Sequence, residues 1–350
     1  MTNTTDRDTF GVRQAEMTAR WFENVKRQHG DVDAYIRTRF SAYIDRWKEA
    51  ARFIPNGSRV LDIGGGNLFE DLVRFLADRK YVYQYIDVDP SSVASSQALA
   101  RSLGIDSFTF QHGFNDVLPF QDSGFDAVFS SHCIEHSFNL PATFSEIRRV
   151  LAGGGNLCMA VPFGWEVNPE HPYFFGPNEW LALLRQAGFR IRTAQIGSEY
   201  PENGYDFFIS AQRLDSLPNG PLLDPEDFRK TNFNFIAFDS DQIKARETPI
   251  IKDDHFICQG DNWEINVLVP KGAREICPIM LRHEWSGSVQ LSCENVASVE
   301  DLYSWFSYVQ PIRLRFEAPL AQDSFATLRP IGRNLASASS EGVLYGVLYR

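Results

Sequence analysis

A glycine-rich turn followed by an acidic residue is the part of this chain best suited to bind a nucleotide-like ligand. The hydrophobic run 59–63 leads into Gly64–Gly66, and a second hydrophobic run, 81–86, ends at Asp87. Glycine has no Cβ and accepts positive φ angles, so its backbone can approach a ligand closely. A carboxylate at the end of the second strand of a βαβ unit is well placed to bind a ribose diol.

The spacing around these glycines argues against two common nucleotide-binding motifs. A dinucleotide-binding fingerprint would need a third glycine at the position of Phe69. A P-loop would need Gly-Lys-Ser or Gly-Lys-Thr, and the turn contains neither. The turn therefore matches neither of these two motifs.

Two histidines and a glutamate form a second group of side chains that could do chemistry. His132, Glu135 and His136 would share one face of a helix, at positions i, i+3 and i+4. The same H-x-x-E-H spacing occurs in a class of zinc proteases. Here it directly follows the hydrophobic run 125–130, which is typical of a strand in a parallel sheet, and this context argues against a peptidase.

Alternating strand and helix patterns must position both groups. Such alternation predicts a parallel sheet covered by helices on both faces, with ligands at the carboxyl edge of the sheet. Residues 177–187 predict a later helix, and 191–196 with 207–211 predict an antiparallel hairpin. The other predicted strands are 60–63, 81–86, 108–110, 125–130 and 156–161, and the other predicted helices are about 68–79, 91–103 and 141–151.

The two ends of the chain have a different character. Hydrophobic residues recur at helical spacing over 10–54 and predict a pair of packing helices. A turn-rich linker at 217–221 precedes period-two runs that predict an antiparallel sandwich or barrel. These runs cover residues 263–269, 279–285, 312–316 and 342–349.

Several of these segments together resemble the class I S-adenosylmethionine (SAM) dependent methyltransferases, over residues of about 55–212. The run Val60-Leu61-Asp62-Ile63-Gly64-Gly65-Gly66 resembles the first motif of that family. Leu118-Pro119-Phe120, Phe125–Ser130, Glu146–Leu151 and Gly188-Phe189 resemble its later segments, in the same order. The resemblance implies an α/β Rossmann-like seven-stranded methyltransferase fold, followed here by an all-β antiparallel, sandwich-like domain.

The resemblance also implies a cofactor, SAM, and the residues that bind it. Asp87 matches the ribose-binding acid of the family. The acid that often recognises adenine is replaced by Phe114, which could stack on the adenine while Asn115 or Asp116 supplies a polar contact; alternatively these residues only form a loop. The implied cofactor-binding residues are Asp62, Gly64, Gly65, Gly66, Asp87, Val88, Phe114, Asn115 and Ser131.

The catalytic residues implied by the resemblance are His132, Glu135, His136 and His171. Three interpretations stay open for the first three: a base or acceptor-orienting role, a structural role, or a divalent-ion site. Some relatives bind an ion through Glu-x-x-Glu-His, but His132 replaces the first glutamate and would weaken a magnesium site, so no metal ligand is assigned. His171 lies in an aromatic-rich loop where the family often contacts its acceptor, although those aromatic residues could equally be core.

The composition narrows the classes of protein that fit. The chain has 350 residues, of which 43% are hydrophobic and 23% charged, and this suits two globular domains. Its net charge of −11 argues against a broad nucleic-acid or anionic-membrane surface. No segment approaches the ~20 apolar residues of a membrane span, and the polar start is unlike a signal peptide. The five cysteines lack a C-x-x-C pair and indicate reduced thiols in a cytoplasmic protein.

The sequence thus predicts a helical lid or cap at 1–54, a SAM-dependent methyltransferase domain at 55–215 and an all-β accessory domain at 216–350. The predicted reaction is O-methylation of a small or medium polar acceptor such as a sugar, nucleotide-sugar or glycan. A sugar is predicted by analogy, because aromatic faces suit sugar rings. Three tryptophans, Trp263, Trp285 and Trp305, could be exposed and serve this purpose, or they could fill the core. No nucleic-acid partner is predicted, and a dimer is only a family-level expectation.

Two other functions fit the same sequence. The first domain could be a non-catalytic SAM-binding scaffold, with a β-domain that binds a glycan or a protein partner. The intact Asp62, Gly64, Gly66 and Asp87 argue against this alternative. A weaker alternative is another SAM-fold enzyme, such as an aminopropyl- or carboxymethyl-transferase, which the mass of the product would distinguish from a methyltransferase.

Overall fold

The chain divides into two compact units. The computed structural model describes residues 4–28, 32–166, 171–200, 204–218 and 222–350. The first unit comprises residues 1–162 and 177–225, and the second comprises residues 163–176 and 226–350. The segment 163–176 therefore interrupts the first unit in the sequence but belongs to the second. The functional domain limits predicted at residues 54 and 215 stay predictions.

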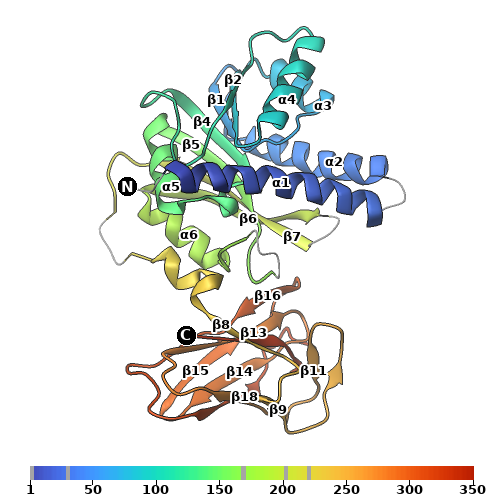
Figure 1. Cartoon of the computed structure of the whole chain (residues 1–350), viewed down its shortest axis with the longest axis vertical. Coiled ribbons are helices and arrows are strands. Elements are labelled where there is room, and N and C mark those ends of the chain that lie inside the picture. The colour runs from blue at the N-terminus through green and yellow to red at the C-terminus, as the bar shows by residue number, and fades with distance from the viewer. Residues whose placement is uncertain (1–3, 29–31, 167–170, 201–203, 219–221) are drawn as a thin grey trace. The chain divides into compact units, whose positions relative to one another are not determined.

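In the described residues of the first unit, seven strands form one mixed sheet (Figure 1). Their order is β3-β2-β1-β4-β5-β7-β6, and only β7 runs antiparallel to its neighbours. This order confirms the predicted Rossmann-like seven-stranded fold with a closing hairpin. The strands are β1 (Arg59–Ile63), β2 (Val82–Asp87), β3 (Thr109–His112), β4 (Phe125–Ser131), β5 (Leu151–Val161), β6 (Phe189–Tyr200) and β7 (Gly204–Arg213).

Helices cover both faces of this sheet. Successive strand residues such as Val60 and Leu61, or Val128 and Phe129, are all fully buried although they point to opposite faces. Hydrophobic runs of this kind are typical of parallel strands between two helical layers. The helices are α1 (Thr4–Gln28), α2 (Val32–Ala50), α3 (Glu70–Asp78), α4 (Pro90–Ser102), α5 (Leu140–Val150), α6 (Pro177–Gln186) and the 3₁₀ helix η1 (Ile134–His136).

The C-terminal part of α2 packs on the sheet. The Trp47 ring stacks on Phe129 with centroids 3.9 Å apart, and Tyr43 meets Phe129 edge-on. Ile44 is partly buried against the same core. The structure does not describe the side chains of the remaining apolar residues at this spacing, which are Trp21, Phe22, Val25, Tyr35, Ile36 and Phe40. A lid function for the N-terminal helices therefore stays a prediction. Among the described helices, none has the length and apolar character needed to cross a membrane.

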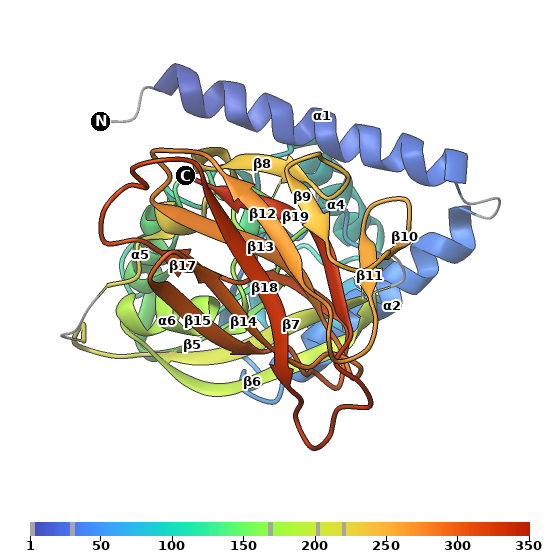
Figure 2. The same ribbon diagram turned by 90° about the horizontal axis from the view of Figure 1, so that it is seen from below.

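In the described residues of the second unit, the strands form two antiparallel sheets (Figure 2). One has the order β10-β11-β19-β13-β16, with β17 beside β13 and β8 beside β19, and the other has the order β15-β14-β18-β12-β9. Ile276 and Leu344 of the first sheet share one apolar core with Val267 and Leu328 of the second, which confirms the predicted all-β architecture.

The bounds of these elements are as follows. They are η2 (Pro225–Phe228), η3 (Lys230–Asn232), β8 (Asn234–Ala237), β9 (Ile243–Ala245), β10 (Ile250–Ile251), β11 (Phe256–Cys258), β12 (Ile265–Val269), β13 (Glu275–Arg282), β14 (Ser288–Cys293), β15 (Val296–Asp301), β16 (Tyr308–Pro311), β17 (Leu314–Arg315), β18 (Ser324–Gly332) and β19 (Gly342–Tyr349).

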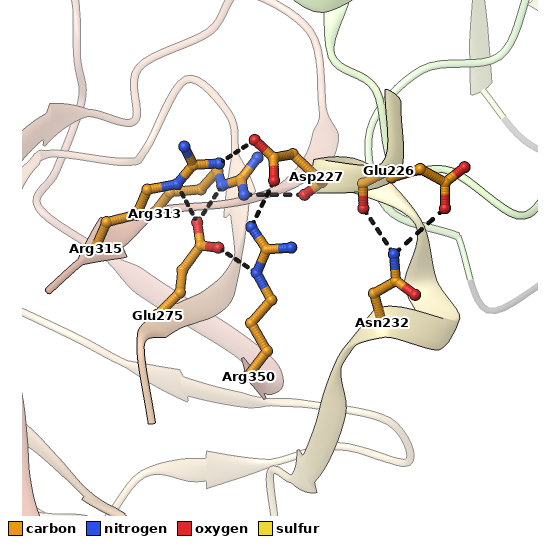
Figure 3. A network of polar contacts seen from close by, with 7 residues as sticks. All are labelled: Glu226, Asp227, Asn232, Glu275, Arg313, Arg315 and Arg350. Atoms are coloured by element: carbon orange, nitrogen blue, oxygen red, sulfur yellow. Dashed lines mark hydrogen bonds and ion pairs between the residues drawn. The ribbon is translucent and has the colours of Figure 1, made fainter. Parts of the chain in front are cut away.

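Within the second unit, a network of three arginines and two acids ties η2 to the strands (Figure 3). The buried Glu275 carboxylate accepts hydrogen bonds from the Nε atoms of Arg313, Arg315 and Arg350, at 2.6, 3.0 and 2.8 Å. Asp227 accepts from Arg315 and Arg350 at 2.8 and 2.7 Å. Burial would raise the pKa of Glu275, but the arginine hydrogen bonds outweigh it and hold that pKa below its usual value. The network therefore joins Asp227 of η2 to Arg350, the last residue of the printed sequence.

The aromatic loop after β5 is part of the core of the second unit. Tyr173, Phe174 and Phe175 are buried, and Phe174 packs on Phe228. The Trp165 N–H donates to the Val309 carbonyl at 2.6 Å. Of the two interpretations open for these aromatic residues, the core interpretation fits this packing.

Candidate cofactor and active site

The glycine turn after β1 has the backbone conformation that only glycine adopts easily. Gly64 and Gly66 have φ angles of +71° and +58°. The Gly64 N–H donates to the Ile86 carbonyl at 2.8 Å. A Cβ on Gly64 would lie 2.2 Å from the sulfur of Cys133, and one on Gly65 would lie 2.7 Å from the Tyr85 ring. The turn is therefore packed closely between the ends of β2 and β4.

Asp87, at the end of β2, is fixed against this turn. Its Oδ2 accepts from the Gly66 N–H at 3.0 Å and lies 3.1 Å from the Tyr85 hydroxyl, and its Oδ1 accepts from the Asp89 N–H at 2.9 Å. Burial raises the pKa of Asp87 above its usual value. One acceptor position on Oδ1 is left for a ligand, since a carboxylate oxygen can accept two hydrogen bonds. The structure thus brings the predicted ribose-binding acid beside the glycine turn.

Asp62 lies below the turn and is fully buried. Its Oδ2 accepts from the Tyr83 hydroxyl at 2.6 Å, and its Oδ1 has no hydrogen-bond partner in the described part of the chain. Burial raises the pKa of Asp62 to about 7, although the Tyr83 hydrogen bond acts in the opposite direction. A buried acceptor of this kind is costly unless a donor meets it. Asp62 therefore suits a ligand that carries a hydrogen-bond donor or a positive charge.

We expect Asp62 to make the stability of the ligand-free protein depend on pH. Between a pH of about 4 and about 7 the folded protein holds a proton on Asp62 that the unfolded chain has released, so stability falls as the pH rises. The loss is at most about 4 kcal/mol, for a pKa raised from 3.8 to about 7. The free energy of unfolding can be measured in urea for the wild type and for Asp62→Asn. The value for the wild type minus the value for the variant should be lower at pH about 7.5 than at pH about 4.5. A difference that does not change with pH would contradict the raised pKa.

The predicted adenine-binding residues lie under helix α1. A Cβ on Gly11 of α1 would lie 3.1 Å from the Phe114 ring and 3.3 Å from the Val88 side chain, so the helix passes close above both. Asn115 is held by protein contacts, because its amide donates to Ser137 and accepts from Thr143 at 3.0 and 3.1 Å. The nitrogen and the oxygen of its side-chain amide thus already have partners.

Asp116 is a better candidate than Asn115 for the polar contact. It is buried and accepts from Arg7 of α1 at 3.1 Å through Oδ2. Its Oδ1 has no hydrogen-bond partner among the described residues, and the same holds for the buried hydroxyl of Ser131 at the end of β4. The assignments of Val88, Phe114, Asn115 and Ser131 to the cofactor stay predictions.

His132, Glu135 and His136 gather at the carboxyl edge of the sheet, but not on an α-helix. The conditional expectation of a shared helical face does not hold, because His132 has a left-handed φ of +51° and only 134–136 form a 3₁₀ turn. The Glu135 Oε1 lies 3.6 Å from the His132 Nδ1 and 3.9 Å from the His136 Nε2. Glu135 is buried, and neither of its oxygens has a hydrogen-bond partner in the residues that the structure describes.

A buried ion pair beside His132 is a feature that the sequence analysis missed. Arg46 of α2 donates to both carboxylate oxygens of Asp206 in β7, each at 2.6 Å. The Asp206 Oδ2 also lies 3.5 Å from the His132 Nε2. The available signal was a charged residue inside an apolar pattern, since Arg46 precedes Trp47 and Asp206 precedes the run 207–209.

His171 lies in the second unit. Its Nδ1 is 2.7 Å from the Glu166 Oε2, and Lys230 donates to the Glu166 carbonyl at 2.6 Å. These contacts hold His171 within the segment 163–176, and its predicted catalytic role stays a prediction.

Comparison with known proteins finds a family match over the part of the chain that contains the glycine turn. Residues 61–159 match the family model of a methyltransferase domain. The chain carries a methyltransferase domain over these residues. The cofactor of this domain is S-adenosyl-L-methionine.

Curated relatives of this methyltransferase domain match only part of the chain. An uncharacterised methyltransferase of Bacillus subtilis is 30% identical over 116 residues, which cover 33% of this chain and 43% of that protein. Ajmaline N-methyltransferase of Rauvolfia serpentina is 36% identical over 108 residues, which cover 31% and 36%. A solved SAM-dependent methyltransferase of Aquifex aeolicus is 22% identical, with a TM-score of 0.41 and coverage of 49% and 90%. The chain spans less than half the length of the two curated relatives.

The acceptor groups at the carboxyl edge of the methyltransferase domain are complementary to the hydrogen-bond donors of SAM. The cofactor carries an ammonium group, a ribose diol and an adenine amino group, all of which donate hydrogen bonds. Asp62 and Asp116 each offer a buried acceptor oxygen without a partner among the described side chains, and Asp87 keeps one acceptor position. We expect these residues, with the turn at Gly64 and Gly66, to hold the cofactor.

Proposed function

We propose that this protein is a methyltransferase that methylates an oxygen of a small or medium polar acceptor, such as a sugar, a nucleotide-sugar or a glycan. The observation that carries the proposal is the buried Glu135 carboxylate, which has no hydrogen-bond partner in the described residues. It follows Cys133, whose sulfur packs against Gly64 of the cofactor turn. A hydroxyl donor from an acceptor would supply the missing hydrogen bond.

The protein mainly positions the reactants in this proposal. Bound SAM supplies an electrophilic methyl group, and the cofactor-binding residues orient it. A hydroxyl acceptor has a proton to lose, so a base within hydrogen-bond reach contributes to the rate. Glu135 accepts a hydrogen bond from the acceptor hydroxyl. His136, whose Nε2 lies 3.9 Å from the Glu135 Oε1, assists in removing the proton of that hydroxyl. A structural role and a divalent-ion role for these residues are the alternatives that experiments must separate.

Exposed aromatic side chains in the second unit support a saccharide acceptor by analogy. Trp285 and Trp305 are 50% and 67% exposed, whereas Trp263 is buried in the core and donates to the Ser340 carbonyl. Aromatic faces pack well on the apolar faces of sugar rings. Of the three tryptophans named from the sequence, two are thus exposed. A dimeric state and a cytoplasmic location stay predictions.

A calorimetric titration with SAM and with its demethylated product tests the cofactor assignment directly. Saturable one-site binding of both, followed by methylation of a saccharide in an acceptor screen, would support the whole proposal. Methylation of another class of acceptor alone would remove the sugar. Binding without turnover of any acceptor would favour the non-catalytic scaffold, and the product mass would reveal transfer of a group other than methyl.

We expect His136→Ala to lower turnover far more than cofactor affinity. Loss of a residue that assists proton transfer should reduce kcat by about 100-fold or more, while the Kd for SAM changes by less than about threefold. His255→Ala, which removes an imidazole paired with Asp254 in the second unit, is the matched control and should leave both values unchanged. A loss of thermal stability alone would indicate a structural role. Turnover that a chelator does not affect would remove the divalent-ion role.

A further inference from the structure

The Arg46–Asp206 pair is almost completely removed from solvent. The two side chains are 4% and 1% exposed, and the pair is bidentate, with two hydrogen bonds of 2.6 Å. A buried ion pair often stabilises a protein no more than apolar residues of the same size, because both charges lose their hydration. The position of the pair in the fold suggests a purpose other than stability.

The pair lies at the functional edge of the methyltransferase sheet. Phe207 pairs with Val161, the last residue of β5, and Asp206 directly precedes Phe207. β5 ends at the same edge as β1 and β4, because these three strands are parallel. Asp206 therefore stands at the carboxyl edge, where open α/β sheets bind their ligands.

Gly197 of strand β6 lies beside this pair, and its lack of a side chain leaves room for the two charged groups. A Cβ on Gly197 would lie 1.9 Å from the Asp206 Oδ1 and 2.4 Å from the Arg46 Nη2. No side chain larger than hydrogen fits there unless the ion pair moves. Gly197, Asp206 and Arg46 come from three separate elements, and together they define one geometry for the carboxylate.

The carboxylate of Asp206 in turn faces His132. The distance from the Asp206 Oδ2 to the His132 Nε2 is 3.5 Å, and the other ring nitrogen lies 3.6 Å from Glu135. The backbone of His132 is fixed as well, because its N–H donates to the Ala160 carbonyl at 2.9 Å. Polar side chains thus follow one another from α2 to the proposed acceptor site, in the order Arg46, Asp206, His132, Glu135.

We propose that Arg46 and Asp206 are positioning residues, which orient the His132 ring and, through it, the Glu135 carboxylate. This inference rests on the proposed function, since it gives the two residues a part in presenting Glu135 to the acceptor. It also revises the part of His132. Both of its ring nitrogens face carboxylates, so His132 connects the ion pair to Glu135 and the acceptor contact belongs to Glu135.

The test uses nitrogen NMR of the full-length protein labelled with ¹⁵N-histidine, with SAM present. The chain has seven histidines, and the spectrum of His132→Gln identifies the ring signals of His132. Gly197→Ala places a methyl group into the ion pair without removing either charge. Gly153→Ala, a glycine of β5 whose Cβ would come no nearer than 3.3 Å to its closest neighbour, is the matched control.

We expect the His132 ring signals to shift or broaden in Gly197→Ala and to stay unchanged in Gly153→Ala. With an identified acceptor, kcat should fall by about tenfold or more while the Kd for SAM changes by less than about twofold. If Gly197→Ala does not fold, the double variant Arg46→Gln/Asp206→Asn is used in its place. It removes both charges of the pair together. Unchanged His132 signals in a folded variant would overturn the inference.

The NMR result is independent of the proposed function. A wild-type protein that binds SAM but methylates nothing would refute the proposed reaction, whereas its His132 signals would still respond to Gly197→Ala if the ion pair orients the ring. Conversely, normal turnover in Gly197→Ala would reject a positioning role and leave the methyltransferase assignment intact.

Discussion

Replacing Gly64 by valine is expected to abolish SAM binding. Gly64 has a φ of +71°, which a β-branched residue adopts only with strain. A Cβ would also lie 2.2 Å from the sulfur and 2.4 Å from the Cβ of Cys133, and a Cβ atom cannot move aside as the end of a long side chain can. The turn must therefore shift as a whole, away from Cys133. Calorimetry should detect no saturable binding at millimolar SAM, under conditions where circular dichroism shows a folded protein.

Gly57→Val is the matched control for this experiment. Gly57 has a similar φ of +79°, but a Cβ there would meet no atom within 4 Å. The control should lose roughly 1–2 kcal/mol of stability from the left-handed backbone alone and bind SAM normally. Equal loss of binding in both variants would point to general destabilisation. A Gly64→Val protein with normal SAM affinity would contradict the placement of the cofactor at this turn.

The sheet of the first unit was predictable because its signals are local. The runs 60–63, 125–130 and 156–161 are mostly apolar, and β1, β4 and β5 contain them. The second unit was predicted less completely. β15 (Val296–Asp301) has no buried residue, so it shows no hydrophobic alternation that could mark a strand. Edge strands of this kind depend on pairing with a neighbour, in this case β14, rather than on their own composition.

The candidate site also has a part that could be predicted from the sequence and a part that could not. Glycines and an acid at the ends of strands β1 and β2 can be found from spacing, because parallel strands end at one edge. The contact between Gly64 and Cys133, and the pair formed by Arg46 with Asp206, join residues far apart in the chain. No local pattern contains such pairs. The left-handed backbone of His132 was also unpredictable, since a histidine seldom adopts it without tertiary constraint.

Replacing Asp87 by alanine is expected to weaken SAM binding strongly while the protein stays folded. The variant removes a charged acceptor for the ribose, and hydrogen bonds to charged groups contribute about 1.5–3 kcal/mol. The Kd for SAM should therefore rise by about 10- to 100-fold. The variant also frees the N–H groups of Gly66 and Asp89, which Asp87 now binds at 3.0 and 2.9 Å, so the turn itself loosens. Isothermal titration of wild type and variant measures the change.

Asp89→Ala separates the ribose contact from the loosened structure. Asp89 caps α4 by accepting from the N–H groups of Ser91 and Ser92, at 2.9 and 3.3 Å, and losing such a cap costs about 1 kcal/mol of stability. Because its side chain is directed to the helix, Asp89→Ala should lower the melting temperature and leave the Kd for SAM nearly unchanged. Equal weakening in both variants would assign the effect to the start of α4. An unchanged Kd in Asp87→Ala would mean that the cofactor does not lie against the end of β2.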